Sequence, residues 1–199
     1  MKPVISIVGR PNVGKSTLFN RIIGYKKAIT EDTPGVTRDR NYGEFDYSGR
    51  YFILADTGGF EPSTEDNIFR LVEKQIHTSM DESSAIIFVL DGKDGVLPQD
   101  EEIADILRKY DKPVFYTVNK VDSSAREHTA SEFYRLGAKR LYTVSALHGL
   151  GIAELLEDIC STIPARYGKG KDAALHEATE DMRVAIVGRP NTGKSSITN

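Results

Sequence analysis

Glycines and a lysine near the amino terminus form a pattern typical of phosphate-binding loops (P-loops). Residues 9–16 read G-R-P-N-V-G-K-S and fit G-x-x-x-x-G-K-[ST], after an apolar run and before an amphipathic segment. Glycines let backbone N–H groups converge on phosphate oxygens at a helix N-terminus, whose dipole favours anions. Lys15 would neutralise the β- and γ-phosphates, and the Ser16 hydroxyl would bind Mg²⁺. The candidate phosphate-binding residues are Gly9, Arg10, Pro11, Asn12, Val13, Gly14, Lys15, Ser16 and Thr17.

A second polar group follows the apolar run 51–56. Asp56, Thr57, Gly58 and Gly59 read D-T-G-G. An aspartate at the end of a strand beside the phosphate loop is suited to holding Mg²⁺ and its hydration shell. Gly59 would let its backbone N–H approach a γ-phosphate. A plain strand-end turn explains such a short match equally well, but its spacing after the phosphate loop favours the magnesium interpretation.

The residues Asn119, Lys120, Val121 and Asp122 indicate which base is bound. Guanine presents N1–H and N2–H₂ donors on one edge, and a carboxylate such as Asp122 can accept both. Adenine has no matching pair, so an ATP-dependent kinase is disfavoured. Lys120 can lay its aliphatic stem along the base, and Asn119 can bind the purine or tie this loop to the phosphate loop. A backbone N–H for the guanine O6 is expected from Ser145, Ala146 and Leu147.

Strand and helix patterns alternate between these motifs. Apolar strand runs are expected at 4–8, 42–47, 51–56, 85–91, 114–119 and 141–144, and helices at 15–23, 100–110 and 151–162. Ser48-Gly49 indicates a hairpin between the second and third runs. Alternation of this kind predicts an α/β fold with a mostly parallel six-stranded sheet, one antiparallel strand and helices on both faces. The motifs then meet at one edge of the sheet, where ligands bind in open α/β sheets.

The phosphate-loop pattern occurs twice, which predicts a duplicated domain. The expected organisation is a first domain at 1–164, a charged linker at 165–182, and the first strand and P-loop of a truncated second domain at 183–199. Because a single strand and half a helix cannot form a core, the chain is interpreted as a fragment of a longer protein. The second P-loop comprises Gly188, Arg189, Pro190, Asn191, Thr192, Gly193, Lys194 and Ser195.

Together these motifs resemble the TrmE-Era-EngA branch of translation GTPases, and most closely its double-GTPase group. The resemblance implies a Ras-like G domain of the P-loop NTPase fold, GTP and GDP as ligands, and a switch role in assembly of the large ribosomal subunit. It also assigns 34–39 to the segment P-G-x-T-R-D, in which Thr37 would close over Mg²⁺ and the γ-phosphate. The expected magnesium ligands are Ser16, Thr37 and Asp56.

The sequence departs from the Ras-like pattern for hydrolysis, because Phe60 stands where Ras-like enzymes place a water-orienting glutamine. Relatives with an asparagine at the position of Asn12 use K⁺ beside the phosphates, and a hard cation can supply an arginine's charge. A purely local role for Asn12 in stiffening the loop stays open. The expected activity is slow, K⁺-stimulated GTP hydrolysis, with Lys15, Thr37, Asn12 and Gly59 as catalytic residues.

Charge and composition disfavour membrane, secreted and nucleic-acid-binding classes of protein. The formal net charge is −3, no apolar run reaches membrane-spanning length, and the amino terminus has no signal-peptide pattern. A cytoplasmic protein without a membrane partner is expected, with no direct nucleic-acid site evident. The alternative to an enzyme is a nucleotide-gated docking module whose hydrolysis is negligible without a partner.

Overall fold

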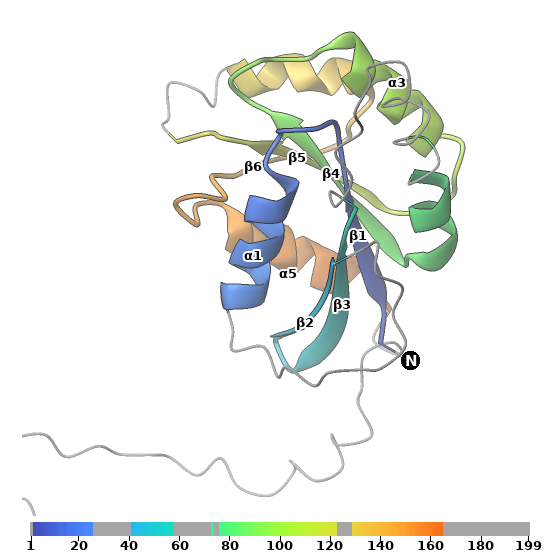
Figure 1. Ribbon diagram of the computed structural model, residues 1–199, viewed down its shortest axis with the longest axis vertical. Coiled ribbons are helices and arrows are strands. Elements are labelled where there is room, and N and C mark those ends of the chain that lie inside the picture. Colours follow the sequence, from blue (N-terminus) through green and yellow to red (C-terminus); the bar gives the residue numbers. More distant parts are fainter. Residues whose placement is uncertain (1, 26–40, 58–72, 74–75, 123–128, 165–199) are drawn as a thin grey trace, which may run out of the picture.

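The computed structural model describes residues 2–25, 41–57, 73, 76–122 and 129–164. Its six strands form one sheet in the order β2-β3-β1-β4-β5-β6 (Figure 1). All neighbouring strands are parallel except β2 and β3, which form the antiparallel hairpin. This confirms the predicted α/β fold. The strands are β1 (Val4–Val8), β2 (Asn41–Tyr47), β3 (Arg50–Asp56), β4 (Ala85–Asp91), β5 (Val114–Asn119) and β6 (Leu141–Thr143).

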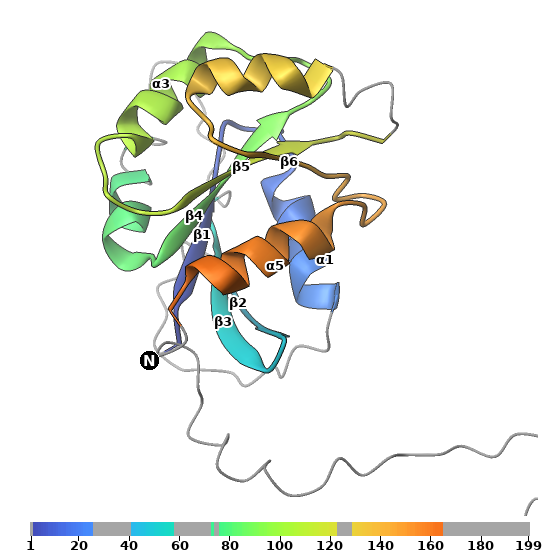
Figure 2. The ribbon, with the colours of Figure 1, turned by 180° about the vertical axis from the view of Figure 1, so that it is seen from behind.

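Helices cover both faces of the sheet, as the alternating pattern predicted. Figures 1 and 2 show α1 and α5 on one side and α3 on the other. The helices are α1 (Lys15–Tyr25), α3 (Pro98–Leu107), α5 (Ile152–Thr162) and the 3₁₀ helix η1 (Thr129–Leu136). Residues 76–82 are also helical.

Strand β4 explains why two hydrophobic cores form. All seven of its residues are buried. Ile87 and Val89 belong to the core under α1 and α5, whereas Ile86 and Phe88 belong to the core under α3 and η1. Successive side chains of a strand point to opposite faces, so a continuous apolar run is what a doubly covered parallel strand requires. Burial of each such side chain stabilises the fold by about 1.5–3 kcal/mol.

The ends of α3 differ from the sequence prediction. The helix begins at Pro98 and ends at Leu107, whereas the apolar spacing predicted residues 100–110. Pro98 has no N–H to satisfy and a φ suited to the first helical position. The Asp100 carboxylate accepts the Leu97 N–H at 3.0 Å, which caps the first turn. The helix therefore begins two residues before Asp100, and the acidic Asp100 and Glu101 belong to its first turn. Helix η1 and the helical residues 76–82 are not among the helices expected from the sequence.

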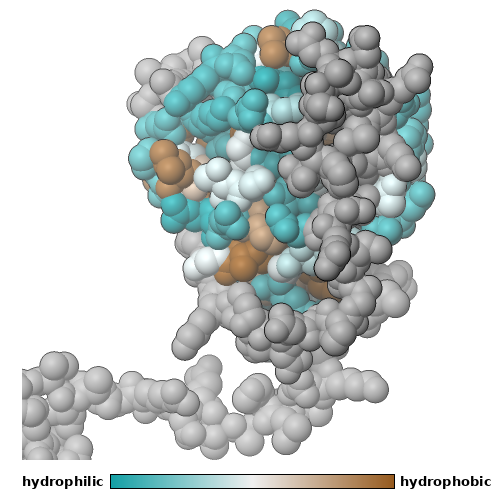
Figure 3. Space-filling view, in the orientation of Figure 1, coloured by the Kyte–Doolittle hydropathy of each residue, from teal (hydrophilic) through white to brown (hydrophobic). Residues whose placement is uncertain are grey.

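The surface seen in Figure 3 is mostly hydrophilic among its described residues, with separate hydrophobic spots. The large apolar residues that are exposed include Tyr134, Leu147 and Leu150. In the described part of the chain, no helix is long and apolar enough to cross a membrane. The predicted linker, 165–182, and the predicted first strand and P-loop of a second domain, 183–199, lie outside the described residues.

Candidate nucleotide-binding site

The carboxyl ends of the parallel strands bring the sequence motifs to one edge of the sheet. The loop after β1 holds residues 9–14, and Asp56 ends β3 opposite Ile7 of β1. The loop after β5 begins at Lys120, and the loop after β6 contains residues 144–150. Motifs far apart in the sequence are therefore neighbours at the edge where open α/β sheets bind ligands.

The phosphate loop owes its shape to backbone conformations that few residue types adopt. Gly9, Asn12 and Gly14 have φ angles of 151°, 65° and 96°. A Cβ atom on Gly14 would lie 2.4 Å from Nδ2 of Asn119, and one on Gly9 would lie 2.4 Å from the Val89 carbonyl oxygen. Both glycines are therefore required by close approach as well as by positive φ. The loop folds tightly over the sheet edge and leads directly into α1.

Lys15 folds its side chain back over this loop. Its Nζ donates to the carbonyl oxygens of Gly9 at 2.9 Å and of Arg10 at 2.8 Å. Burial lowers the pKa of Lys15 to about 8, an effect that the Asp56 charge opposes and the Arg10 charge reinforces. A desolvated ammonium short of negative charge favours an arriving anion, because phosphate oxygens would stabilise its charged form. The position and the electrostatics of Lys15 both suit phosphate binding.

The residues proposed to hold Mg²⁺ supply the correct chemistry at this edge. Asp56 is buried at the end of β3, and its charge acts on Lys15. The exposed Ser16 lies in the first turn of α1. Mg²⁺ prefers oxygen ligands and shares its shell with water and phosphate, so a hydroxyl and a carboxylate fit it. Thr57 donates its hydroxyl to the Ile7 carbonyl at 2.7 Å, which fixes the start of the next loop.

Some predicted site residues cannot be placed. Gly58, Gly59 and Phe60, together with Thr37 of the segment 34–39, lie outside the described residues.

Asn119 joins the phosphate loop to the loop after β6. Its Nδ2 donates to the Val13 carbonyl at 2.9 Å, and its Oδ1 accepts the Ala146 N–H at 2.9 Å. Of the two roles predicted for Asn119, the structure shows the tie between loops. Because the Ala146 amide is already used, the next amide, that of Leu147, is the better donor toward a base. Within the described residues, the Leu147 N–H donates no hydrogen bond.

Lys120 spans the gap between the base-side loop and the phosphate loop. Its Nζ donates to the Asn12 carbonyl at 2.8 Å and contacts the Asp91 carboxylate. Burial alone would raise the pKa of Asp91, but the hydrogen bonds from Lys120 and from the backbone of Lys93 and Asp94 lower it. The carboxylate of Asp91 therefore stays charged and fixes the Lys120 ammonium. This contact stretches the aliphatic stem of Lys120 across the edge, as contact with a base face requires.

Asp122 lies beside the loop after β6, where a guanine edge is expected. Its Oδ1 accepts the Ser145 hydroxyl at 2.7 Å, and its Oδ2 lies 3.8 Å from Nζ of Lys93. The side chain is 31% exposed, so the carboxylate is oriented but accessible. The neighbouring Val121 is buried and anchors the loop. A carboxylate held in this way can accept two donors from a ligand.

Sequence reasoning missed the contacts behind the motifs. Arg10 donates from Nη2 to Asp94 at 3.0 Å and from Nε to Asp100 at 3.3 Å, so it ties the phosphate loop to the start of α3. Burial raises the pKa of Asp100, although Leu97 and Arg10 both stabilise its charge. From the sequence, Asp91 was expected only to end the strand 85–91. An acidic residue directly after an apolar run could have indicated that Asp91 has a charged partner.

Similarity to known proteins agrees with this geometry. The chain is 48% identical over 199 residues to GTPase Der of Geotalea daltonii, a match that covers 100% of this chain and 44% of that relative. The chain thus spans less than half the length of such curated relatives.

Solved structures give the same answer about the fold. A variant of Aquifex aeolicus Era bound to GDP and AlF₄⁻ has a TM-score of 0.65 and 32% identity, over 82% of this chain and 58% of that one. Era bound to MgGDPNP and a segment of 16S ribosomal RNA has a TM-score of 0.63 and 29% identity, with the same coverage. The family described as 50S ribosome-binding GTPase matches residues 4–120. The chain belongs to the 50S ribosome-binding GTPase family.

Proposed function

We propose that this chain binds GTP with Mg²⁺ and hydrolyses it to GDP and phosphate. The observation that carries the proposal is the double hydrogen bond of Asn119, which places the phosphate loop and the base-side loops at one edge. Lys15 would hold the β- and γ-phosphates, and Ser16 and Asp56 would hold Mg²⁺ directly or through water. The bound ion would neutralise charge on the phosphates. Thr37 and Gly59 are proposed to complete the γ-phosphate site.

Guanine is proposed as the base because Asp122 lies at the accessible edge of the site. Binding is tested by calorimetry with GDP and ADP in the presence of Mg²⁺. We expect GDP to bind at least about a hundredfold more tightly, because ADP leaves the carboxylate without its two donors. Equal affinities for the two nucleotides would overturn the guanine assignment and favour an ATP-dependent enzyme.

Hydrolysis is proposed to be slow and stimulated by K⁺. The side chain of Asn12 is exposed at the rim of the phosphate loop, and within the described residues it makes no hydrogen bond. An asparagine that stiffened the loop would bond locally, so this exposure supports a ligand role. Phosphate release is measured with Mg²⁺ in matched KCl and NaCl, for the wild type and for Asn12→Ala. We expect faster release in KCl only for the wild type.

The same assay tests the competing proposal. Equal and near-zero rates in both salts, with GTP still bound, would overturn potassium activation and favour a nucleotide-gated docking module. Phe60, which replaces a water-orienting glutamine, is the reason why this alternative is kept.

A role as a cytoplasmic switch in assembly of the large ribosomal subunit is proposed from the family to which the chain belongs. Cosedimentation of the chain with purified 50S subunits, in GDP and in a non-hydrolysable GTP analogue, tests it. We expect binding in one nucleotide state only. Binding that is absent in both states would overturn the proposal for this part of the protein. Residues 183–199, the predicted first strand and P-loop of a second domain, are proposed to begin a second G domain in a longer chain.

A further inference from the structure

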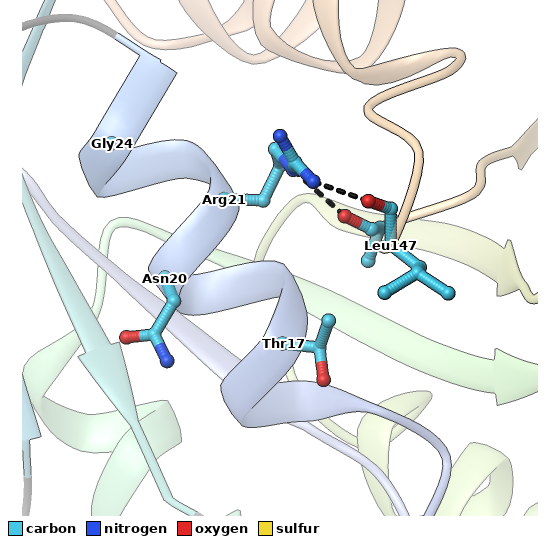
Figure 4. Close-up of a pocket in the computed structure, with 6 residues that line it drawn as sticks. Thr17, Asn20, Arg21, Gly24 and Leu147 are labelled. Atoms are coloured by element: carbon cyan, nitrogen blue, oxygen red, sulfur yellow. Dashed lines mark hydrogen bonds between the residues drawn. The ribbon is translucent and has the colours of Figure 1, made fainter.

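An arginine outside the recognised motifs holds the loop that follows β6. Arg21 lies on α1, and its Nε donates to the Ala146 carbonyl at 2.8 Å. Its Nη2 donates to the Leu147 carbonyl (Figure 4). The two carbonyls are 125 and 126 residues away in the sequence. One guanidinium therefore clamps two successive peptide groups of this loop, which suits its planar fork of donors.

The packing between the loop and α1 is open on one side. An open pocket of about 480 Å³ separates them, with Thr17 and Arg21 on the helix side and Ala146 and Leu147 on the loop side. Figure 4 shows the Arg21 side chain reaching across to the loop. Leu147 is 67% exposed, so its side chain does not anchor the loop in the core. Ala146 is buried in the core under α1 and α5, so packing and the clamp together hold its carbonyl, whereas the exposed Leu147 leaves the following peptide group to hydrogen bonds.

Because the peptide group is planar, the hydrogen bond from Arg21 to the Ala146 carbonyl also orients the Leu147 N–H. The Ala146 carbonyl and the Leu147 N–H belong to one peptide group, and the described chain has no cis peptide bond. In a trans peptide the C=O and N–H point in opposite directions. By fixing the carbonyl on α1, Arg21 fixes the direction of the Leu147 N–H away from α1. On the same loop, Ser145 donates to Asp122, and the Ala146 N–H is used by Asn119.

We propose that Arg21 is a positioning residue that determines how strongly the site recognises the O6 atom of guanine. It acts through the Ala146–Leu147 peptide group, whose N–H is the donor to O6. The inference rests on the proposed function, because it requires a guanine nucleotide in the site. It adds a residue of α1, outside every recognised motif, to the determinants of base specificity.

The test compares three nucleotides on the 199-residue chain by calorimetry with Mg²⁺. GDP has O6, N1–H and the 2-amino group; IDP lacks only the 2-amino group; 2-aminopurine riboside diphosphate lacks O6 and N1–H. The variant Arg21→Met keeps the apolar stem and removes the clamp. Arg50→Met is the matched control, because Arg50 also donates to backbone carbonyls, those of Ile163 at 2.9 Å and Pro164 at 3.0 Å, at the end of α5.

For Arg21→Met we expect GDP and IDP each to bind about tenfold more weakly, because a donor to O6 is no longer oriented. Binding of 2-aminopurine riboside diphosphate should change by no more than about twofold, since it has no O6 to lose. The ratio of GDP to IDP affinity should stay constant, because it reports on Asp122. Arg21→Lys should restore part of the loss, and Arg50→Met should lower the melting temperature without changing any ratio.

Two results would overturn the inference. If Arg21→Met weakens all three nucleotides equally, or none of them, Arg21 has only a structural role and the proposed function stands. If the wild-type chain itself fails to bind GDP, both the proposed function and the proposed role of Arg21 are overturned.

Discussion

The phosphate loop, residues 9–16, and the base-side loops, residues 119–122 and 145–150, lie at the same sheet edge but are held differently. The phosphate loop takes its shape from its own backbone, through positive φ at Gly9, Asn12 and Gly14. The base-side loops also contain positive-φ residues, Lys120 and Gly149, but side-chain hydrogen bonds to distant segments hold them in place. Their own Asn119 and Lys120 reach to the phosphate loop, and Arg21 reaches from α1 to the loop after β6. The conformation of a loop that depends on its own backbone can be predicted from consecutive residues. The conformation of a loop that depends on distant side chains cannot be predicted in this way.

The largest effect is expected from Gly14→Ala, because Gly14 lies where the phosphate loop contacts Asn119 of the base-side loop. A Cβ at this position meets Nδ2 of Asn119 at 2.4 Å, and the φ of 96° is strained for alanine. We expect the free energy of unfolding to fall by about 3–4 kcal/mol and GDP binding to be lost. Urea denaturation and calorimetry measure the two effects.

Gly24→Ala is the matched control for this substitution. A Cβ on Gly24 has no neighbour within 4 Å, and Gly24 lies in α1, where alanine is the better helix former. We expect it to raise the free energy of unfolding by up to about 1 kcal/mol. If Gly14→Ala behaved in the same way, the close approach to Asn119 would not constrain the loop.

Asn119→Ala separates the two regions without adding any atom. It leaves the Val13 carbonyl and the Ala146 N–H without their partner. We expect a loss of about 2–3 kcal/mol in the free energy of unfolding, because buried polar groups lose their hydrogen bonds. GDP binding should weaken together with stability, since both loops are released. The exposed Asn41→Ala, measured by the same urea titration, should change stability by less than about 0.5 kcal/mol.

Asp122→Asn tests the base side alone. The carboxamide cannot accept both guanine donors, so GDP should bind about 10–100-fold more weakly. Xanthosine diphosphate should gain relative to GDP, because its C2 carbonyl can accept from the new amide N–H₂. Calorimetry with both nucleotides measures the shift, and the exposed Asp111→Asn serves as control. An unchanged ratio of the two affinities would remove Asp122 from the base site.

The smallest effect is expected from Asp91→Asn, which weakens the link from Lys120 to the phosphate loop. The amide oxygen can still accept from the backbone of Lys93 and Asp94, so only the charge facing Lys120 is lost. We expect a loss of about 1 kcal/mol in the free energy of unfolding near neutral pH.

The pH dependence of the free energy of unfolding tests the prediction for Asp91→Asn. The pKa of Asp91 in the folded chain is below 3.8, so its contribution is present above that value and is lost as pH falls through the folded pKa. Stability curves of the wild type and of Asp91→Asn, measured by urea titration at several pH values, should therefore converge in acid. A difference that grew in acid would contradict the assignment.

The sequence alone determined the elements whose signals are local. The buried apolar runs predicted β1, β4 and β5 with the bounds that the structure shows. The chemistry of G-x-x-x-x-G-K-S depends on consecutive residues and needs no distant partner. The sequence did not predict helical residues 76–82 or η1. Helix η1 is a 3₁₀ helix of eight residues, whose buried Phe133 and Leu136 are three positions apart, so it is shorter and more tightly wound than the α-helical pattern requires.

Only the tertiary structure decided which partner each polar side chain takes. Asn119 had two chemically reasonable roles, and the parallel sheet placed the Val13 carbonyl, 106 residues away, within its reach. The same sheet brought Arg21 to the Ala146 carbonyl and Lys120 to Asp91. Hydrogen bonds act over about 3 Å, so they depend on neighbours in space. In this chain those neighbours are set by strand order, which no single motif contains.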